Sequence, residues 1–311
     1  MNNKNGVLYL LLCFSFASTL TAGKIAILNG VSPFALAAFR FSLGSIILVI
    51  YFSLKKVITI NHKPGFKLSK NNIYKISILS IFMFIIPFSC IINALVFIPS
   101  GIAGIIGSSI PLFTMIFSHF MFNDERFTKK NVLGLTLGTT GLIILALSGT
   151  KKAFNIEFNN FIKGFVLYIT GCVSVGLGNV FSKKLNPGTN VSYSTLFQAI
   201  IASIFFISMT FIFENPLQIR LKTKIILPII YVSVFGMSLS YVIYYTMLVK
   251  IGPVKMSTIT LIVPVFAVVL GYLMLNEKIN INILFSGAFV ISGVGFILFT
   301  QNIKKEQIQP K

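Results

Sequence analysis

The sequence predicts an all-α integral membrane protein with ten transmembrane helices arranged as two inverted five-helix repeats. Three observations lead to this prediction. Only 10% of the 311 residues are charged and 55% are apolar, whereas soluble domains carry about 25% charged residues. Uncharged stretches recur at the length of about 20 residues that a helix needs to cross a bilayer. Landmarks of the first half of the chain also return, in order, in the second half.

The spans are delimited by where charged residues stop. Ile76–Asn123 contains no Lys, Arg, Asp or Glu and is long enough for two spans, with Pro99-Ser100-Gly101 as the turn between them. Pro33–Leu54, with a single Arg, is a further span. The other seven are expected in the uncharged windows Asn5–Gly23, Asn131–Thr150, Gly164–Ser182, Leu185–Phe213, Ile225–Val249, Met256–Asn276 and Ile279–Ile303.

The basic residues predict the orientation in the membrane. With the N-terminus in the cytoplasm, the inner segments hold 17 Lys and Arg and the outer loops hold seven. Because cytoplasmic loops are enriched in Lys and Arg, both termini are predicted to be cytoplasmic, including a tail at 304–311. The net charge of +20 is then explained by topology and by contact with anionic lipids, without a nucleic-acid partner. The 23 Lys against 3 Arg indicate an AT-rich bacterial genome and therefore the bacterial inner membrane.

The repeat is read from matching positions. Pro111 matches Pro264, and Phe113 matches Phe266, both 153 positions later. Further upstream the offset widens to 158 and 159 positions, because the first half has a longer basic loop. Landmarks that recur in order predict two copies of one unit.

The repeat divides the chain into 1–150 and 161–303, each with five predicted spans. Because five is odd, the second copy enters the membrane from the opposite side, and the two halves are inverted relative to each other. Inverted repeats of this kind are typical of secondary transporters with one central site.

The fourth span of each half carries a stripe of small residues around a proline. Small side chains allow another helix to approach closely, and a proline in mid-span leaves a backbone carbonyl without its helical donor. Two interpretations remain open, plain helix packing or a cavity wall with a hinge at each proline. The predicted hinge and cavity-wall residues are Gly107, Pro111, Thr260 and Pro264.

Four sequence segments resemble a known family. Ile110-Pro111-Leu112-Phe113 and Asn123-Asp124-Glu125-Arg126 are repeated as Val263-Pro264-Val265-Phe266 and Leu275-Asn276-Glu277-Lys278. Over essentially the whole chain this pattern resembles two copies of the EamA domain of the drug/metabolite transporter superfamily. The resemblance implies a ten-helix inner-membrane carrier, and many such carriers export amino acids or other metabolites.

Polar side chains inside the spans are the candidates for substrate binding. Arg40 lies about 10 Å into its span at 1.5 Å per residue, and is either a snorkelling residue or a partner for a substrate anion. Its repeat partner is Gln198, which is also polar. Each of the others could equally make a bond between helices. The remaining candidates are Asn93, Asn179, Ser240, Tyr241 and Tyr244.

All six acidic residues fall in loops or at span ends. This pattern favours exchange or facilitated flow over ion coupling, because ion-driven carriers commonly place a carboxylate in mid-span. Glu125 and Glu277 precede the fifth span of each half, as helix-capping residues or as gating residues that form salt bridges. The cysteines lie far apart in sequence, so no metal site or cofactor is expected, and no catalytic set is apparent.

The predicted function is therefore secondary transport of small polar metabolites, amino acids or their derivatives, by alternating access. The alternative is an exchanger of a nucleoside-type metabolite such as S-adenosylmethionine. A membrane-embedded enzyme or a scaffold is the least favoured class, because enzymes of this kind need buried acids or His pairs. The sequence leaves the direction of transport and the oligomeric state open.

Overall fold

The computed structural model describes residues 3–58, 70–122, 129–148, 157–185, 191–214, 223–244, 247 and 259–308. Within these ranges the chain is all-helical. Its elements are α1 (Asn3–Leu28), α2 (Pro33–Ile58), α3 (Lys70–Ser80), η1 (Ile81–Ile85), α4 (Ile86–Phe97), α5 (Ser100–Gly107), α6 (Ile110–Met121), α7 (Lys129–Ser148), α9 (Phe158–Leu185), α10 (Val191–Phe213), α11 (Thr223–Ser233), η3 (Val234–Leu239), α13 (Ile259–Leu275) and α14 (Ile281–Ile308).

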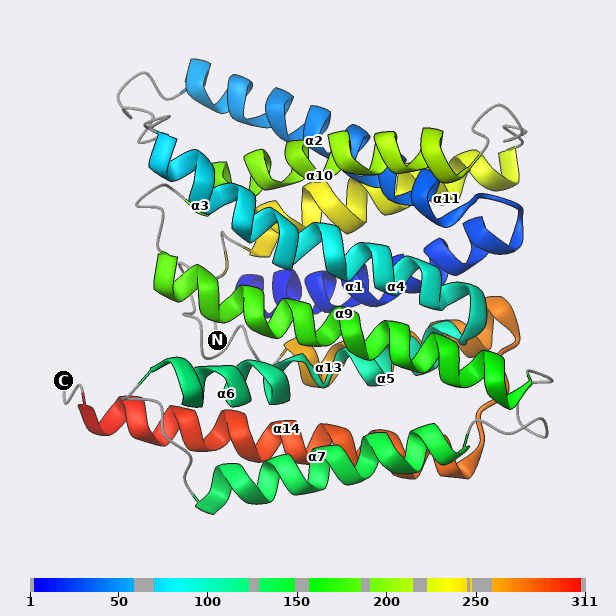
Figure 1. The fold of residues 1–311 in the computed structure, drawn as a ribbon, viewed down its shortest axis with the longest axis vertical. Coiled ribbons are helices and arrows are strands. Elements are labelled where there is room, and N and C mark those ends of the chain that lie inside the picture. The colour runs from blue at the N-terminus through cyan, green and yellow to red at the C-terminus, as the bar shows by residue number, and fades with distance from the viewer. Residues whose placement is uncertain are drawn as a thin grey trace.

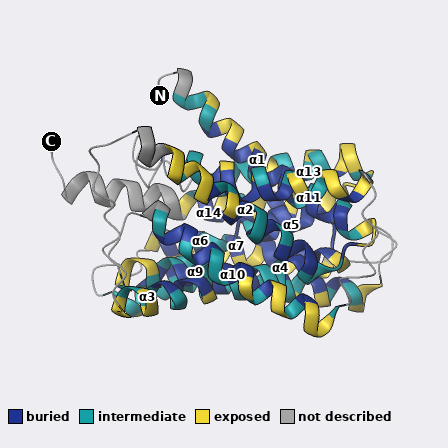
Figure 2. Cartoon of the chain, turned by 90° about the horizontal axis from the view of Figure 1, so that it is seen from above, coloured by how far each residue is buried: buried dark blue, intermediate teal, exposed yellow. Residues whose placement is uncertain are grey.

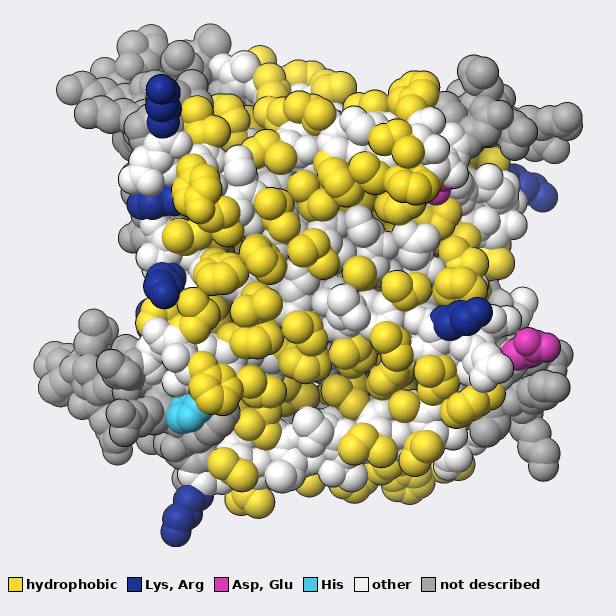
Figure 3. All heavy atoms as spheres, in the orientation of Figure 1, with side chains coloured by type: hydrophobic (Ala, Val, Ile, Leu, Met, Phe, Trp, Pro, Cys, Tyr) yellow, Lys and Arg dark blue, Asp and Glu magenta, His cyan; other side chains and the backbone are white. Residues whose placement is uncertain are grey.

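The helices form a bundle whose outside is apolar. Phe120 is 77% exposed and Phe211 70% exposed, and apolar side chains cover the middle of the bundle while Lys and Arg lie towards its two ends (Figure 3). An apolar belt of this kind is stable in lipid rather than in water. Among the described residues, seven helices are long and apolar enough to span a membrane. Three shorter apolar helices are Asn131–Leu147, Ile259–Leu275 and Ile281–Phe296.

Helices from the first half of the chain pack on helices from its second half. α2 packs on α10, and α7 on α14, with the chain running in opposite directions in each pair (Figure 1). α1 contacts α11 and α13, while α9 contacts α4 and α6. α5 also packs on α13. Buried residues lie between these helices and exposed ones on the outside (Figure 2), so the core of the bundle is made by contacts between the halves.

The bundle has two ends, which we name by what they hold. The terminal end, on the left of Figure 1, holds the start of α1 and the end of α14. The capped end, on the right, holds the starts of α2 and α5 and the ends of α10 and α13.

Two long continuous helices, which we call rods, each contain one π-helical segment. They are Lys70–Phe97 and Lys224–Tyr244. η1 begins at Ile81 and η3 begins at Val234, which is the same 153-position offset that relates Pro111 to Pro264. A π segment widens the turn and redirects the side chains that follow it, and such segments are frequent at functional sites. The residues that follow η1 and η3 face the cavity described next.

Candidate functional site

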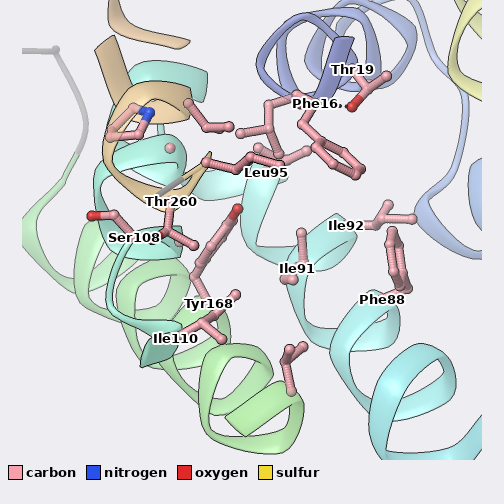
Figure 4. A pocket seen from close by; sticks show the side chains of 18 of the residues that line it. Phe16, Thr19, Phe88, Ile91, Ile92, Leu95, Ser108, Ile110, Tyr168 and Thr260 are labelled. Atoms are coloured by element: carbon pink, nitrogen blue, oxygen red, sulfur yellow. Dashed lines mark hydrogen bonds between the residues drawn. The ribbon is translucent and has the colours of Figure 1, made fainter. Parts of the chain in front are cut away.

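A cavity of about 460 Å³ lies between the two halves. Helices α1, α2, α4, α5, α6, α9 and α13 and the rod that contains η3 all contribute to its wall. Most of the lining is apolar, with hydroxyl groups at intervals (Figure 4), and Asn179 adds a side-chain amide. This volume and composition are those of a small-molecule site, because ligand pockets are mostly apolar clefts of about 300–1,000 Å³.

Arg40 is the charged side chain of this wall. Its Nη2 donates to the carbonyl of Gly236 at 2.8 Å, and its Cζ lies 4.6 Å from the centre of the Phe88 ring. The side chain is only 9% exposed, so it does not snorkel to the surface. Its Nε–H has no hydrogen-bond partner among the described residues, and the guanidinium therefore keeps donor capacity for a ligand.

Gly236 explains how Arg40 reaches this position. A Cβ built on Gly236 would lie 3.1 Å from Cζ of Arg40 and 2.9 Å from the methyl group of Thr19. Gly236 belongs to the π segment η3. A glycine there lets the guanidinium lie directly on the backbone, and its carbonyl accepts the bond.

Two prolines border the cavity at equivalent places. Pro111 lies in the first turn of α6, directly after the break at Ser108 and Ser109, and has no N–H to donate to the carbonyl of Gly107. Pro264 lies inside α13. All four predicted hinge and cavity-wall residues, which include Thr260, line the cavity.

The small stripe also makes close helix packing, nearer the capped end. A Cβ on Gly104 would lie 2.4 Å from Cβ of Ala267, so α5 and α13 touch at van der Waals distance there. The stripe therefore packs one helix on another towards the capped end and lines the cavity in the middle, and the hinge at each proline stays a prediction.

Three of the other predicted binding residues also line the cavity. Asn179 donates to the hydroxyl of Thr114 at 3.1 Å, which ties α9 to α6. Tyr241 makes edge contacts with the rings of Phe16 and Phe84. Tyr244 lies one turn further along the same rod.

Asn93, Gln198 and Ser240 do not line the cavity. Asn93 donates to the carbonyl of Ser89 at 2.7 Å, and Gln198, 7% exposed, donates to the hydroxyl of Ser194 at 3.1 Å. Ser240 bonds to Ser15 at 2.7 Å. These side chains serve bonds within or between helices.

Glu277 holds the two halves together at the capped end. Its Oε1 accepts from the N–H of Ser100 at 2.6 Å and from its hydroxyl at 2.9 Å, and its Oε2 accepts from the N–H of Gly101 at 2.9 Å. The carboxylate thus caps the N-terminus of α5, where an anion is stabilised by the helix dipole. It caps this helix of the other half instead of its own following helix. Glu125, the matching gate residue, lies outside the described residues.

The turn that ends α13 delivers Glu277 to this place. Asn276 has φ 51°, in the left-handed region where many helices end, and the N–H of Glu277 bonds to the carbonyl of Gly271 at 3.1 Å. A Cβ on Gly271 would collide with the carboxylate at 2.2 Å. The missing side chain is what allows Glu277 to fold back towards α5.

Glu214 makes the same kind of cap on α2. It accepts from the hydroxyl of Ser32 at 2.5 Å and from the N–H groups of Phe34 and Ala35, both at 2.9 Å. At the same end, Lys24 donates to the carbonyl of Leu95 at 2.5 Å, so it ties α1 to α4 instead of snorkelling. Three charged side chains therefore link helices at the capped end.

Several lining residues are not among those predicted from the sequence. Phe88 and Ile91 stand 153 positions before Tyr241 and Tyr244, so the repeat offset would have found them. Tyr168 is 3% exposed, and its hydroxyl faces the bare backbone of Gly107. No sequence signal marks Tyr168. In the described part of the chain, no three His, Cys, Asp or Glu side chains lie close enough together to hold a metal ion.

The model of the EamA-like transporter family matches residues 4–147 and 162–299. The chain belongs to the EamA-like transporter family. It is accordingly a multi-pass membrane protein and a transporter of this family rather than an enzyme.

Two curated relatives of this EamA-like transporter match over nearly their full length. The uncharacterized transporter YoaV of Bacillus subtilis is 22% identical over 92% of this chain and 94% of its own. A probable amino-acid metabolite efflux pump of Escherichia coli is 25% identical over 94% of this chain and 93% of its own. A solved crystal structure at 14% identity shares the fold, with a TM-score of 0.66 over 97% of this chain and 99% of that one.

Proposed function

We propose that this EamA-like protein is a secondary transporter of amino acids or their derivatives that works by alternating access. The observation that carries the proposal is the symmetry of the cavity lining. Phe88 and Tyr241, and Pro111 and Pro264, are pairs related by 153 positions, and each pair faces the cavity. A site built from matching positions of two halves can be presented to either side of a membrane in turn.

The fold that we propose is two inverted five-helix repeats, 1–150 and 161–303, with a cytoplasmic tail at 304–311. It is supported by the antiparallel pairs α2 with α10 and α7 with α14. The seven long apolar helices and the three shorter ones together match ten spans. The paired π segments support the same scheme.

We propose the bacterial inner membrane with both termini in the cytoplasm. α1 begins and α14 ends at the terminal end of the bundle (Figure 1), and the basic residues of the segments assigned to that side outnumber those of the other. Anionic lipid headgroups are then the surface partners of that end. The capped end is the outer end in this orientation.

The outer end forms the closed gate in this conformation. Glu214 and Glu277 each fix a helix start of the first half to a helix end of the second, and Lys24 closes α1 onto α4 beside them. Opening this gate requires these bonds to break, while the halves bend at Pro111 and Pro264.

The substrate class is supported by the cavity and by the relatives. A volume of about 460 Å³ admits a free amino acid or a somewhat larger derivative. Relatives named as probable amino-acid metabolite efflux pumps occur in Escherichia coli and Salmonella typhimurium, at 25% and 23% identity.

Counterflow in proteoliposomes tests this function, because it needs no knowledge of the driving force. Vesicles are loaded with an unlabelled pool of amino acids together with their deaminated and N-acylated derivatives and, separately, of nucleoside metabolites that include S-adenosylmethionine, and then receive labelled traces. Transient, saturable accumulation in the amino-acid vesicles is the expected result. Accumulation with the nucleoside pool alone would refute the substrate class, and flux without saturation would indicate a channel.

A further inference from the structure

The guanidinium of Arg40 lies in a mostly apolar wall and keeps N–H donor capacity that the described residues do not use. It has five N–H donors, of which one bonds to the carbonyl of Gly236, and its buried Nε–H has no partner among the described residues. Arg40 is also the one charged side chain among the described residues that line the cavity. The protein therefore holds a buried positive charge beside a ligand-sized space, a costly arrangement that an anion would relieve.

The planar fork of an arginine matches one ligand group especially well. A carboxylate accepts two parallel N–H bonds from a guanidinium, and such charge-assisted pairs are about twice as strong as neutral bonds. Cζ of the guanidinium lies 4.6 Å from the centre of the Phe88 ring, and its Nη2 is held by the carbonyl of Gly236. The fork is thus held in place before a ligand arrives, which reduces the entropy lost on binding.

The rest of the cavity wall is mostly apolar and therefore favours a ligand with an apolar body. Phe16, Phe88, Ile91, Leu95 and Tyr168 line the same cavity as Arg40, and their ring and aliphatic side chains are seen in Figure 4. Burying an apolar body of about this size against them removes water from both surfaces, which drives binding.

An ammonium group on a ligand would find no acidic side chain to pair with among the described residues of the same wall. The described lining residues include no Asp or Glu, and an ammonium beside Arg40 would be repelled by the guanidinium. The described charges therefore complement a net anion better than a zwitterion, and a zwitterion better than a cation.

We infer that the substrate is an amphipathic organic monocarboxylate, such as a deaminated or N-acylated amino acid, with its carboxylate on Arg40 and its apolar body against the aromatic wall. This inference rests on the proposed transport function of the same cavity. It narrows the amino-acid derivatives to those that carry a carboxylate and no free ammonium.

Three compounds with one phenylethyl body separate the contributions. 3-Phenylpropanoate carries only the carboxylate, L-phenylalanine carries both charges and phenethylamine carries only the ammonium. Each is titrated into the purified full-length protein in detergent by calorimetry, which avoids passive leakage through a bilayer. We expect 3-phenylpropanoate to bind most tightly, and to bind at least about tenfold more tightly than phenethylamine. Equal or tighter binding of phenethylamine, or tighter binding of L-phenylalanine than of 3-phenylpropanoate, would overturn the inference.

Two variants link the preference to Arg40. Arg40→Gln removes the charge and is expected to weaken 3-phenylpropanoate binding about tenfold or more, while Arg40→Lys restores part of it. Gly236→Ala keeps the charge but crowds the guanidinium, and we expect it to weaken the same ligand. Gly295→Ala is the matched control, because a Cβ there meets nothing within 4 Å. Unchanged affinity in both Arg40→Gln and Gly236→Ala would overturn the inference.

The counterflow assay keeps this inference separate from the proposed function. Saturable counterflow of amines or nucleosides by a protein that does not bind 3-phenylpropanoate would refute the monocarboxylate and leave a carrier. Tight binding of 3-phenylpropanoate with no counterflow of any compound would support the binding site and refute the transport cycle.

Discussion

The carboxylate of Glu277 is expected to stabilise closure of the capped end, and its removal tests this directly. It accepts three hydrogen bonds at the start of α5, two from Ser100 and one from Gly101. Bonds to a charged group contribute about 1.5–3 kcal/mol each when buried. We take about 1 kcal/mol for each bond, because Glu277 is half-buried and water can replace part of the interaction.

Glu277→Ala should then destabilise the closed arrangement by about 3 kcal/mol, a shift of about 150-fold towards opening at 1.4 kcal/mol per factor of ten. Glu277→Gln keeps one acceptor oxygen and loses the charge, so its effect should be about 1–2 kcal/mol. The two variants therefore form a graded series.

Spin labels on either side of the contact between Glu277 and the start of α5 measure the opening. Val96 at the end of α4 is exposed, and so is Lys278 after α13, so cysteines at both positions can be labelled in a background without native cysteines. Double electron–electron resonance should show a single distance in the parent protein and an added longer distance in Glu277→Ala. Glu157→Gln removes an exposed carboxylate at the same end and is the control. An unchanged distance distribution together with an unchanged thermal midpoint in Glu277→Ala would refute the claim that Glu277 stabilises the closed arrangement.

Three further predictions concern the other contacts between the halves. Glu214→Gln should lower the thermal midpoint by weakening the cap on α2 by about 1–2 kcal/mol, and a midpoint equal to the parent's would contradict this role. Gly104→Ala should cost about 1–3 kcal/mol by overpacking, and Ala267→Gly should restore stability in the double variant; Gly295→Ala, which has open space, should not destabilise. Pro264→Ala supplies an N–H that can close the helix, and should lower the maximal counterflow rate more than it raises the half-saturating concentration. Equal rates would remove the hinge.

Local pattern was enough to predict part of the cavity lining. Pro111 and Pro264 were predicted to border a cavity because proline in mid-span and small neighbours are properties of a single helix. Tyr241 and Tyr244 follow the same logic, since one helix turn puts both on one face. The structure brings all four to the cavity.

Residues whose role depends on a neighbouring helix were harder to read. Gln198 corresponds to Arg40 in the repeat, yet its side chain bonds within its own helix while Arg40 faces the cavity. Ser240 is taken up by Ser15, which lies 225 positions away in the chain. A polar side chain looks the same in sequence whether it meets a ligand or another helix.

The sequence by itself determined that this chain consists of long apolar helices, because a bilayer requires long uncharged helices. It also determined that the second half repeats the landmarks of the first, because a repeat preserves their spacing. The tertiary structure decided where the charges act. Glu277 caps α5 because the turn that ends α13 and the bare backbone of Gly271 direct it there. Arg40 faces the cavity because Gly236, nearly 200 positions away, leaves room for its guanidinium. Such approaches depend on distances between helices, and those distances are set by packing rather than by spacing along the chain.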